Sequence, residues 1–551
     1  MPAAKTPFLI PAIAAAALVA GGVGAYLYFK GGVGESASPL SSAKIVPDEA
    51  IMTAYISTDE KAWSQLKKFG TPEAQALVEK SIKNFQTEML TDTNFDIEKD
   101  LKPWMGGVMF AVLPPSNYKP SDTSAKASTP TMLMVIGIKD RGNALNFAQK
   151  LKSQKGATTK ESNYKGVTVA EVTEKPGSLY NVAVLNDHLV VSDNRKAVET
   201  AIDTFKGEPS FAGREGVSNL LTQGTDLKNP LAQVYLPDYG AAIQQLAAAS
   251  PDATPLPPAT LNQLKQVKSM VVGLGVDDAG LRLKALAKLD PKIAAEFKPV
   301  PGKVVSQFPV ETIGLMGGQG IKYTWNSVVA QSQNDPSIGL AVNLIKTQLQ
   351  AVNLDADKEV FGWMDGEFAL GLIASDKGML ASTGFGGALV VQTSDRATAE
   401  ATLAKLDNLA KSNAVNVAQR DLQGKSVTEW KVSPTEALLG HGWLDQNTLF
   451  LAVGGPIVDV MANKPPATLD GSETYKTVTK SLPKEGVGYF YLDMDRVVAL
   501  LNSPAFKSQT GTIPPETSAI LNSIHGIGMS AVQSDKTTSQ FEVLMALKPA
   551  K

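Results

Sequence analysis

The sequence contains no cysteine in its 551 residues. Disulfides, thiolate metal sites and cysteine nucleophiles are therefore excluded. Histidine is almost as scarce, because the chain has only His188, His441 and His525. No two of them have the short spacing of a metal-binding pair such as H-x-x-x-H. We expect each histidine to be solvated or hydrogen-bonded, and we predict no metal site.

An excess of charge of one sign is also missing. The chain has 52 basic and 54 acidic residues, a formal net charge of −2, and no long run of one sign. A nucleic-acid-binding surface would need a basic stripe, so we do not expect nucleic acid as a partner. The hydrophobic fraction of 43% and the charged fraction of 19% are typical of globular domains with cores. A chain of this length has room for about two to four such domains.

The sequence motifs of common catalytic sites are absent as well. Neither a G-x-S-x-G nucleophile elbow nor a P-loop occurs. The segment "DMDR" places Asp493 and Asp495 two residues apart, a spacing that can hold a metal ion through oxygen ligands. We interpret it as a strand-to-helix turn in which one of the two aspartates caps the helix. The sequence therefore predicts no catalytic residue and no cofactor.

One long apolar run stands at the amino terminus. Residues 6–29 carry no charge and lie between Lys5 and Lys30. As a helix this run would span about 36 Å, enough to cross a bilayer core of ~30 Å. We predict a membrane anchor over residues 1–30, with a cleaved signal peptide as the alternative, and a Gly/Ser/Pro-rich tether over 31–44. A short amino-terminal tail favours a lumenal or periplasmic location for the rest of the chain.

The chain also repeats itself. Residues 95–113, "FDIEKDLKPWMGGVMFAVL", are echoed by residues 354–372, "LDADKEVFGWMDGEFALGL". Further pairs follow in the same order, such as "DRGNALNFAQKL" at 140–151 and "DRATAEATLAKL" at 395–406. Chance does not produce ordered matches of this kind, so we infer an internal duplication.

The duplication predicts two related units, residues 45–295 and 303–549. Alternating segments joined by turn residues predict hairpins, for example "YNVAVLNDHLVVSD" at 180–193 and "SMVVGLGVDDAGLRLKALAKL" at 269–289. Hairpins imply antiparallel pairing. We therefore expect an α+β protein of two tandem homologous units, each an antiparallel sheet packed with helices, after an amino-terminal transmembrane helix.

The echoed segment contains a candidate structural motif that both units share. We interpret its tryptophans as plugs between helix and sheet, because an indole buries a large apolar area. Its glycines would permit a tight turn from helix to strand. A functional aromatic platform at the same place is the alternative. The motif residues are Trp104, Met105 and Gly107 in the first unit and Trp363, Met364 and Gly366 in the second.

The chain as a whole resembles a domain-of-unknown-function family of cyanobacterial, membrane-anchored proteins. The resemblance is carried by the apolar amino terminus and by the segments "VPDEA" at 46–50, "DLKPWMGGVMFAVL" at 100–113 and "VFGWMDGEFALGL" at 360–372. It covers about residues 40–548. The family has no assigned activity, so the resemblance implies no catalytic residues. It implies a photosynthetic bacterium, with the thylakoid or plasma membrane as host.

Three functional hypotheses follow. The first is a non-enzymatic, membrane-tethered binding or assembly protein that presents its two units to a protein partner on the lumenal or periplasmic side. The anchor, the duplication and the lack of a catalytic constellation motivate it. The second is a carrier of an apolar ligand, such as a lipid or a pigment, between sheet and helices. A hydrolase built on dispersed carboxylates is a remote third.

Overall fold

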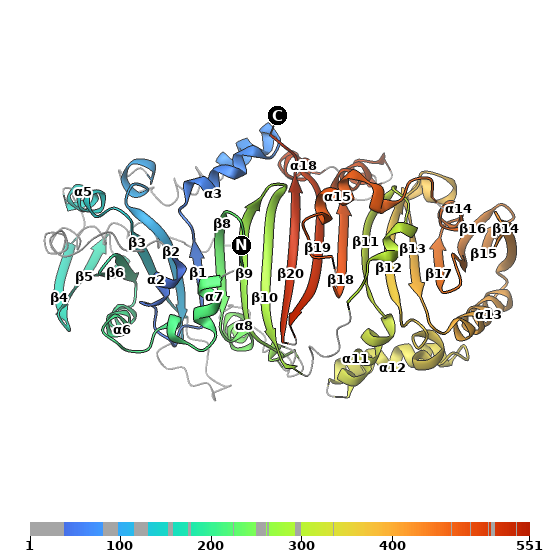
Figure 1. Cartoon of the computed structure of the whole chain (residues 1–551), viewed down its shortest axis with the longest axis horizontal. Helices are drawn as coiled ribbons and strands as arrows, with labels where there is room; N and C mark the ends of the chain where they lie inside the picture. The colour runs from blue at the N-terminus through green and yellow to red at the C-terminus, as the bar shows by residue number, and fades with distance from the viewer. Residues whose placement is uncertain are drawn as a thin grey trace. The chain divides into compact units, whose positions relative to one another are not determined.

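The computed structural model describes residues 38–80, 97–114, 130–152, 158–174, 178–223, 225–248, 260–261, 264–291, 299–333, 335–463, 465–484, 486–504, 506–507, 513–535 and 537–550. These residues divide into two compact units. Unit 1 contains the described residues of Met1–Lys68, Gln75–Asp277 and Leu283–Asp290. Unit 2 contains those of Phe69–Ala74, Asp278–Arg282 and Pro291–Lys551. Figure 1 labels the helices and strands.

Unit 1 is built on antiparallel strands. They are β1 (Met52–Ile56), β2 (Met105–Leu113), β3 (Thr131–Ile138), β4 (Thr158–Tyr164), β5 (Val167–Glu174), β6 (Ser178–Leu185), β7 (His188–Ser192), β8 (Pro230–Leu236), β9 (Val267–Asp277) and β10 (Gly280–Leu289), of which β10 belongs to unit 1 from Leu283 on. Hydrogen bonding orders them β4-β5-β6-β7-β3-β2-β1-β8-β9-β10. Both hairpins predicted within this unit are present.

Unit 2 has the same strand order. Its strands are β11 (Thr312–Gln319), β12 (Glu367–Ala374), β13 (Phe385–Gln392), β14 (Asn416–Leu422), β15 (Lys425–Ser433), β16 (Glu436–Trp443), β17 (Thr448–Val453), β18 (Gly488–Asp493), β19 (Ile524–Asp535) and β20 (Thr538–Leu547). They are ordered β14-β15-β16-β17-β13-β12-β11-β18-β19-β20. Strand for strand, this is the order of unit 1.

Helices connect these strands. In unit 1 they are α2 (Pro39–Ala43), α3 (Glu60–Ser64), α5 (Arg141–Lys152), α6 (Arg195–Phe205), α7 (Val217–Gln223) and α8 (Tyr239–Ala248), with the 3₁₀ turns η1 (Gln65–Lys68) and η3 (Phe211–Gly213) and the π-turn η2 (Ile97–Leu101). In unit 2 they are α11 (Ile321–Ser332), α12 (Pro336–Gln350), α13 (Arg396–Ser412), α14 (Gly455–Ala462), α15 (Glu473–Thr479), α16 (Met494–Leu501) and α18 (Pro515–Asn522), with the 3₁₀ turns η4 (Lys303–Gln307), η6 (Gly378–Ser382) and η7 (Leu469–Gly471) and the π-turn η5 (Ala356–Val360).

The structure corrects the predicted fold class. Its twenty described strands form a single 20-stranded antiparallel sheet, so the expectation of one sheet for each of two tandem units is wrong. The edge of a sheet exposes unpaired N–H and C=O groups that another strand can satisfy. Hydrophobic alternation in the sequence reports which face of a strand is buried, but it does not report which strand pairs with an edge.

The amino-terminal part of the prediction also changes. No helix among the described residues is both long and apolar enough to cross a bilayer. The transmembrane helix is therefore not supported as part of the fold, and the predicted anchor, residues 1–30, lies outside the described residues. Hydropathy measures the tendency of a segment to leave water, and it does not by itself establish a helix. Within the predicted tether, Pro39–Ala43 form α2, and Ala43 is buried in the core of unit 1.

Each unit buries apolar side chains on the helix-covered parts of its sheet. In unit 2, Leu315, Ala369 and Val390 pack with Ile457 and other apolar residues of α14 in the largest core cluster. The opposite face has a smaller cluster, in which α13 packs beside Trp363. This leaves much of that second face without the cover of α13.

His188 is a buried histidine that the sequence led us to expect in a solvated or hydrogen-bonded state. It lies on β7 in unit 1, and its Nε2 has no hydrogen-bond partner among the described residues. Burial lowers the pKa of His188 to about 4, against a smaller opposite effect of the Asp187 carboxylate. The folded protein therefore holds this imidazole neutral at pH values where the unfolded chain protonates it.

We expect this histidine to make unit 1 acid-sensitive. Between pH 6.5 and pH 4 the unfolded state binds a proton that the folded state does not, so the free energy of unfolding falls with falling pH, by up to about 3 kcal/mol. Urea unfolding of wild type and His188→Leu at pH 7, 5.5 and 4 checks this. As pH falls, the free energy of unfolding of the wild type should fall relative to that of His188→Leu. If the difference in unfolding free energy were the same at all three pH values, His188 would not be the source of the acid sensitivity.

Candidate functional site

The echoed motif has one architecture in both units. The π-turns η2 and η5 precede the two tryptophans, and each indole N–H donates back to a carbonyl four residues earlier. Trp104 Nε1 lies 2.8 Å from the Asp100 carbonyl oxygen, and Trp363 Nε1 lies 2.9 Å from that of Glu359. A carbonyl at the end of a helical turn lacks a partner inside the helix, so each indole satisfies one.

A lysine from the following helix engages the same turn in each unit. Lys150 on α5 places its ammonium 2.7 Å from the Asp100 carboxylate, and Lys405 on α13 places its own 2.5 Å from Glu359. Both lysines are about half exposed, so each ion pair contributes little to stability. The two ion pairs nevertheless join equivalent turns, η2 and η5, to equivalent helices, α5 and α13.

The tryptophans of the motif lie in the cores. Trp104 and Trp363 are each 2% exposed, and Trp104 stacks on Phe147 with ring centroids 5.6 Å apart. Met105 and Met364 are half-buried and pack against the same clusters as their neighbouring tryptophans. Rings buried to this degree offer no open face for a ligand to stack on. A structural role for the motif stays a prediction that mutation can test.

The structure gives a different reason for the motif glycines than the tight turn that we expected. Neither Gly107 nor Gly366 has a positive φ. A Cβ on Gly107 would lie 1.7 Å from the Tyr55 hydroxyl, and a Cβ on Gly366 would lie 2.6 Å from the Gln392 carbonyl oxygen. Both positions need glycine because a neighbouring group approaches too closely for a side chain.

We expect Trp104→Ala and Trp363→Ala each to destabilise its own unit by about 3–5 kcal/mol, because truncation of a buried tryptophan leaves a cavity and removes the indole hydrogen bond to the turn. Calorimetric melting should show the transition lowered by several degrees. Trp63→Ala serves as the control, because Trp63 is 43% exposed. If the Trp104 and Trp363 variants melted at the same temperature as the Trp63 variant, the prediction of a structural role would be wrong.

One face of the sheet in unit 2, here called the apolar sheet face, is lined by apolar residues. Residues directly opposite each other on antiparallel strands lie on the same face, so the pairing defines three rows across seven strands. From β17 to β20 the rows are Leu451, Leu389, Leu370, Met316, Phe490, Met529 and Val543; Val453, Gly387, Leu372, Gly314, Leu492, Ile527 and Met545; and Leu449, Val391, Phe368, Gly318, Gly488, Ala531 and Phe541.

No polar or charged residue interrupts these rows. Val391 and Leu449 are buried, but other members of the rows are exposed. Met316, Leu370, Leu372, Val453 and Phe541 are between 36% and 51% exposed. Antiparallel sheets commonly pack one face and present polar side chains on the other. A contiguous apolar surface of this kind marks an interaction site more often than a solvated face.

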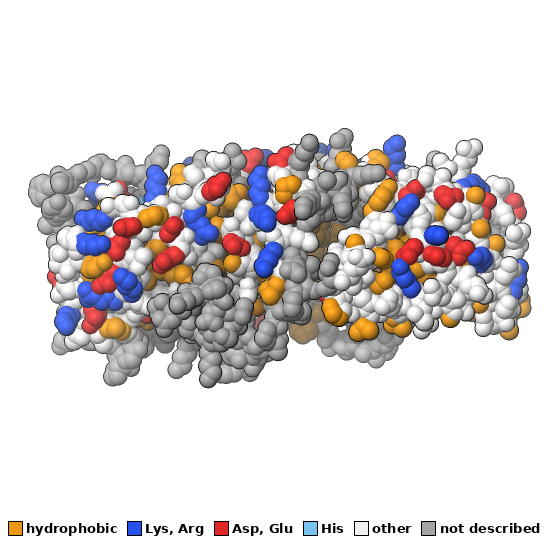
Figure 2. Space-filling view, turned by 90° about the horizontal axis from the view of Figure 1, so that it is seen from below, with side chains coloured by type: hydrophobic (Ala, Val, Ile, Leu, Met, Phe, Trp, Pro, Cys, Tyr) orange, Lys and Arg blue, Asp and Glu red, His pale blue; other side chains and the backbone are white. Residues whose placement is uncertain are grey.

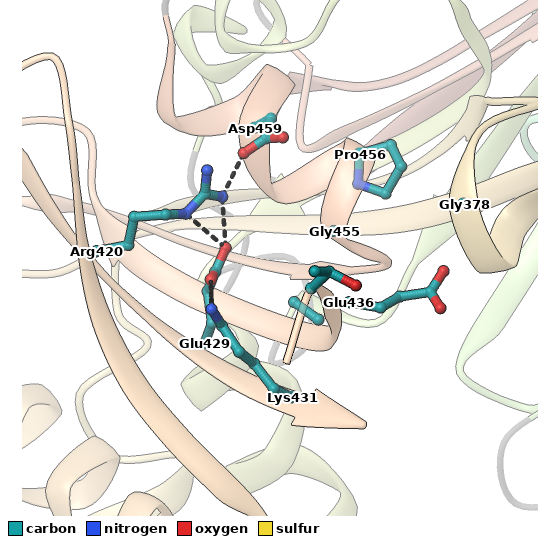
Figure 3. A pocket seen from close by; sticks show the side chains of 10 residues that line it. Gly378, Arg420, Glu429, Lys431, Glu436, Gly455, Pro456 and Asp459 are labelled. Carbon is teal, nitrogen blue, oxygen red and sulfur yellow. Dashed lines mark hydrogen bonds and ion pairs between the residues drawn. The ribbon is translucent and has the colours of Figure 1, made fainter. Parts of the chain in front are cut away.

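The second feature of unit 2 is a charged cavity of about 440 Å³ (Figure 3). Strands β14, β15 and β16 supply its charged lining together with α14, and Gly378 of η6 lies at its edge. The lining residues are Gly378, Arg420, Glu429, Lys431, Thr435, Glu436, Ala437, Gly455, Pro456 and Asp459. The sequence did not single out these residues, because they come from separate elements and match no motif.

Arg420 organises one wall of the cavity. Its guanidinium reaches the Glu429 carboxylate with Nη2 at 2.5 Å and Nε at 3.1 Å, and it also pairs with Asp459. Glu429 is buried, with 4% of its side chain exposed. A buried carboxylate requires such a partner, because its desolvation would otherwise be costly. Lys431 is a weaker neighbour, with its ammonium 3.5 Å from Glu429.

Arg420→Met should destabilise unit 2 by about 3 kcal/mol, since it leaves the Glu429 charge buried without its main partner. The double variant Arg420→Met/Glu429→Gln should recover much of that loss, because it removes the buried charge as well. Chemical denaturation of the wild type, both single variants and the double variant gives the coupling free energy. Additive effects would show that the pair does not interact.

The remaining candidate residues have structural partners. His441 Nε2 lies 2.9 Å from the Asp407 carboxylate, and His525 Nδ1 lies 2.9 Å from Asp495. Asp493 accepts from the Arg496 backbone N–H at the start of α16, so the helix-cap interpretation of "DMDR" is confirmed. The residues that the structure describes contain no group of three His, Asp or Glu placed to hold a metal ion.

Comparison with known proteins gives a family but no activity. The model of a family described as "Protein of unknown function (DUF3352)" matches residues 12–547. No curated protein matches. Crystal form IV of TP0453 is 11% identical, with a TM-score of 0.27 over 45% of this chain and 80% of that one. Crystal form I of TP0453 is 12% identical, with a TM-score of 0.25 over 48% and 85%. Similarities this weak support no inference about the fold or the function of this chain.

Proposed function

Because the chain belongs to a family whose function is unknown, we propose a function from the molecule itself: it is a non-enzymatic binding or assembly protein that holds a protein partner on the apolar sheet face. The single observation that supports this is the set of three uninterrupted apolar rows in unit 2. Their most exposed members, such as Met316 and Leu370, are about half exposed.

The chemistry of the face favours an apolar partner surface. With no charged side chain in the rows, the face offers hydrophobic burial and no ion pairs, as the centre of a protein interface does. A stable interface buries about 800 Å² on each partner, and seven strands provide a broad platform for that area. The pattern recurs in unit 1, where Phe110, Ala54, Val234 and Val272 lie directly opposite one another.

The resemblance of the motif segments to cyanobacterial proteins supports a narrower proposal about origin and place. We place the protein in a cyanobacterium, as a single-pass membrane protein at the thylakoid or plasma membrane with its bulk in the lumen or periplasm. The support is the sequence alone: the segments quoted above and the uncharged residues 6–29.

Site-specific photo-cross-linking in native membranes tests the partner proposal. A photoreactive residue at Leu370 should cross-link a discrete protein, and the same residue at Val432, which is 59% exposed outside the rows, should not. Adding Met316→Ser and Leu372→Ser should remove the Leu370 product without unfolding the protein, because exposed positions tolerate substitution. Equal products at Leu370 and Val432, or none at Leu370, would contradict the proposal.

A carrier of an apolar ligand, such as a lipid or pigment, is a second candidate. The observation that favours it is the presence of Met316, Met529 and Met545 in the rows, since flexible thioether side chains adapt to ligands of varied shape. Native mass spectrometry of gently extracted protein should then show a stoichiometric apolar molecule that the Met316→Ser/Leu372→Ser variant loses. Ligand-free protein in repeated preparations would exclude this candidate.

A further inference from the structure

We propose that helix α12 of unit 2 is a lipid-contacting element. It lies flat in the interface of a bilayer and places the outer side chains Leu340 and Leu344 among the lipids. This inference rests on the membrane location proposed above. It is independent of the apolar sheet face and of the partner proposed there.

The inner side of α12 is an ordinary core face. Ile338, Val342 and Leu349 recur with helical spacing and pack in one cluster with Trp325 of α11. Trp325 also stacks on Phe361, with ring centroids 4.3 Å apart. This cluster attaches α12 to unit 2, so the outer side of the helix is not needed to hold it in place.

The outer side of α12 has leucines where a surface helix normally has charged and polar residues. Leu340 and Leu344 are 73% and 61% exposed, the two highest values among the large hydrophobic side chains that the structure describes. They stand two positions before and two positions after the buried Val342, so they lie together on the opposite side of the helix. Ile345 beside them is 39% exposed. The helix is therefore apolar on both its inner and its outer side.

The outer side also lacks charge. The sequence has no charged residue from Pro336 to Ile345. The one charged residue of α12, Lys346, places its ammonium 2.7 Å from the Asp357 carboxylate. Figure 2 looks onto the side of unit 2 on which α11 and α12 lie in Figure 1, and it shows hydrophobic side chains at the surface there. Transfer of this outer side from water to an apolar medium would desolvate no charge.

The first copy shows that the scaffold accepts charges on this helix. In both copies a helix begins with a proline, Pro72 or Pro336, between the helix of Trp63 or Trp325 and the echoed segment. The charged residues of the first copy within 72–80 are Glu73, Glu79 and Lys80. The uncharged outer side is therefore a property of the second copy, and the fold does not require it.

The size of the outer side favours lipid over a protein partner. A stable protein interface buries about 800 Å² on each partner. The 15 residues of α12 form a helix about 22 Å long, with three large apolar side chains exposed along it. An interfacial helix needs only this much, because its apolar face enters the headgroup and acyl boundary by about 5–10 Å. At this length α12 cannot cross a bilayer core of ~30 Å, so it lies in the membrane plane.

The amino-terminal sequence would keep a bilayer within reach. The uncharged run ends at Phe29, and the described chain begins at Ser38, nine positions later. Nine residues extend over at most about 32 Å. A chain anchored by residues 6–29 is therefore held close to lipid, and this high local concentration favours a contact that would be weak on its own.

Single-site fluorescence in vesicles tests the proposal, since a chain without cysteine can carry one label at an introduced cysteine. Leu340→Cys, labelled with the environment-sensitive dye NBD, is reconstituted as the full chain in phosphatidylcholine vesicles. We expect its emission to shift to shorter wavelength and to be quenched about twofold by lipid brominated near the headgroup end of the acyl chain. Lipid brominated near the chain end should quench less. Lys411→Cys, an exposed position of α13, is the control and should show neither effect.

A second variant keeps the label and removes the apolar contact. Leu344→Ser and Ile345→Ser, added to Leu340→Cys, should reduce the quenching to the level of Lys411→Cys. Circular dichroism shows whether this variant is folded, which we expect because exposed positions tolerate substitution. Raising the salt concentration should leave the signal of Leu340→Cys unchanged, because the outer side of α12 has no charge to screen.

Three results would overturn the proposal. Vesicle-bound protein with the same emission at positions 340 and 411 would show that α12 stays in water, and would leave the membrane location intact. A shifted emission that brominated lipid does not quench would show that a protein surface, such as a second copy of the chain, covers α12. Protein that does not float with the vesicles would contradict the membrane location and this proposal together.

Discussion

The structure of unit 2 depends on the direct register of its antiparallel strands. Because opposite residues share a face, the pairing of Met316 with Leu370 and with Phe490 puts these three side chains, and the rest of their row, on one side of the sheet. A slip of one residue would send these side chains into the α14 core and bring Leu315 and Ala369 to the surface. The same register therefore determines the core and the proposed docking surface together.

The two units use one scaffold for different purposes. The π-turn, the indole that closes it and the lysine that joins it to the next helix occur in both, so they belong to the scaffold. Arg420 and Lys431 stand in unit 2 where unit 1 has Ser162 and Thr173, whereas Glu429 is matched by Glu171. Function on such a scaffold is expected where the copies differ in chemistry and agree in backbone.

Local structure could be predicted from the sequence, and long-range structure could not. Turn residues and alternation identified hairpins such as that of residues 269–289, and capping chemistry identified Asp493 and Asp495 as the two candidates for the helix cap, of which the structure shows Asp493. The single 20-stranded sheet was missed because edge pairing leaves no local pattern. The apolar sheet face did leave a signal, since "EFALGLIA" at 367–374 is apolar at both odd and even positions, as in strands covered on both sides. The charged cavity left none, because Arg420 and Asp459 are ordinary surface residues until the fold brings them together.

The π-turns allow the history of the molecule to be ordered. A π-turn is a rare element of protein structure, so its occurrence at equivalent places in two copies is informative. Both copies have one at the same place, before Trp104 and before Trp363, and each is closed by the same indole contact. The turn therefore belonged to the ancestral single unit, before it was copied. The chemical difference between the copies around Arg420 is younger than the duplication, so it arose on a scaffold that both copies have kept.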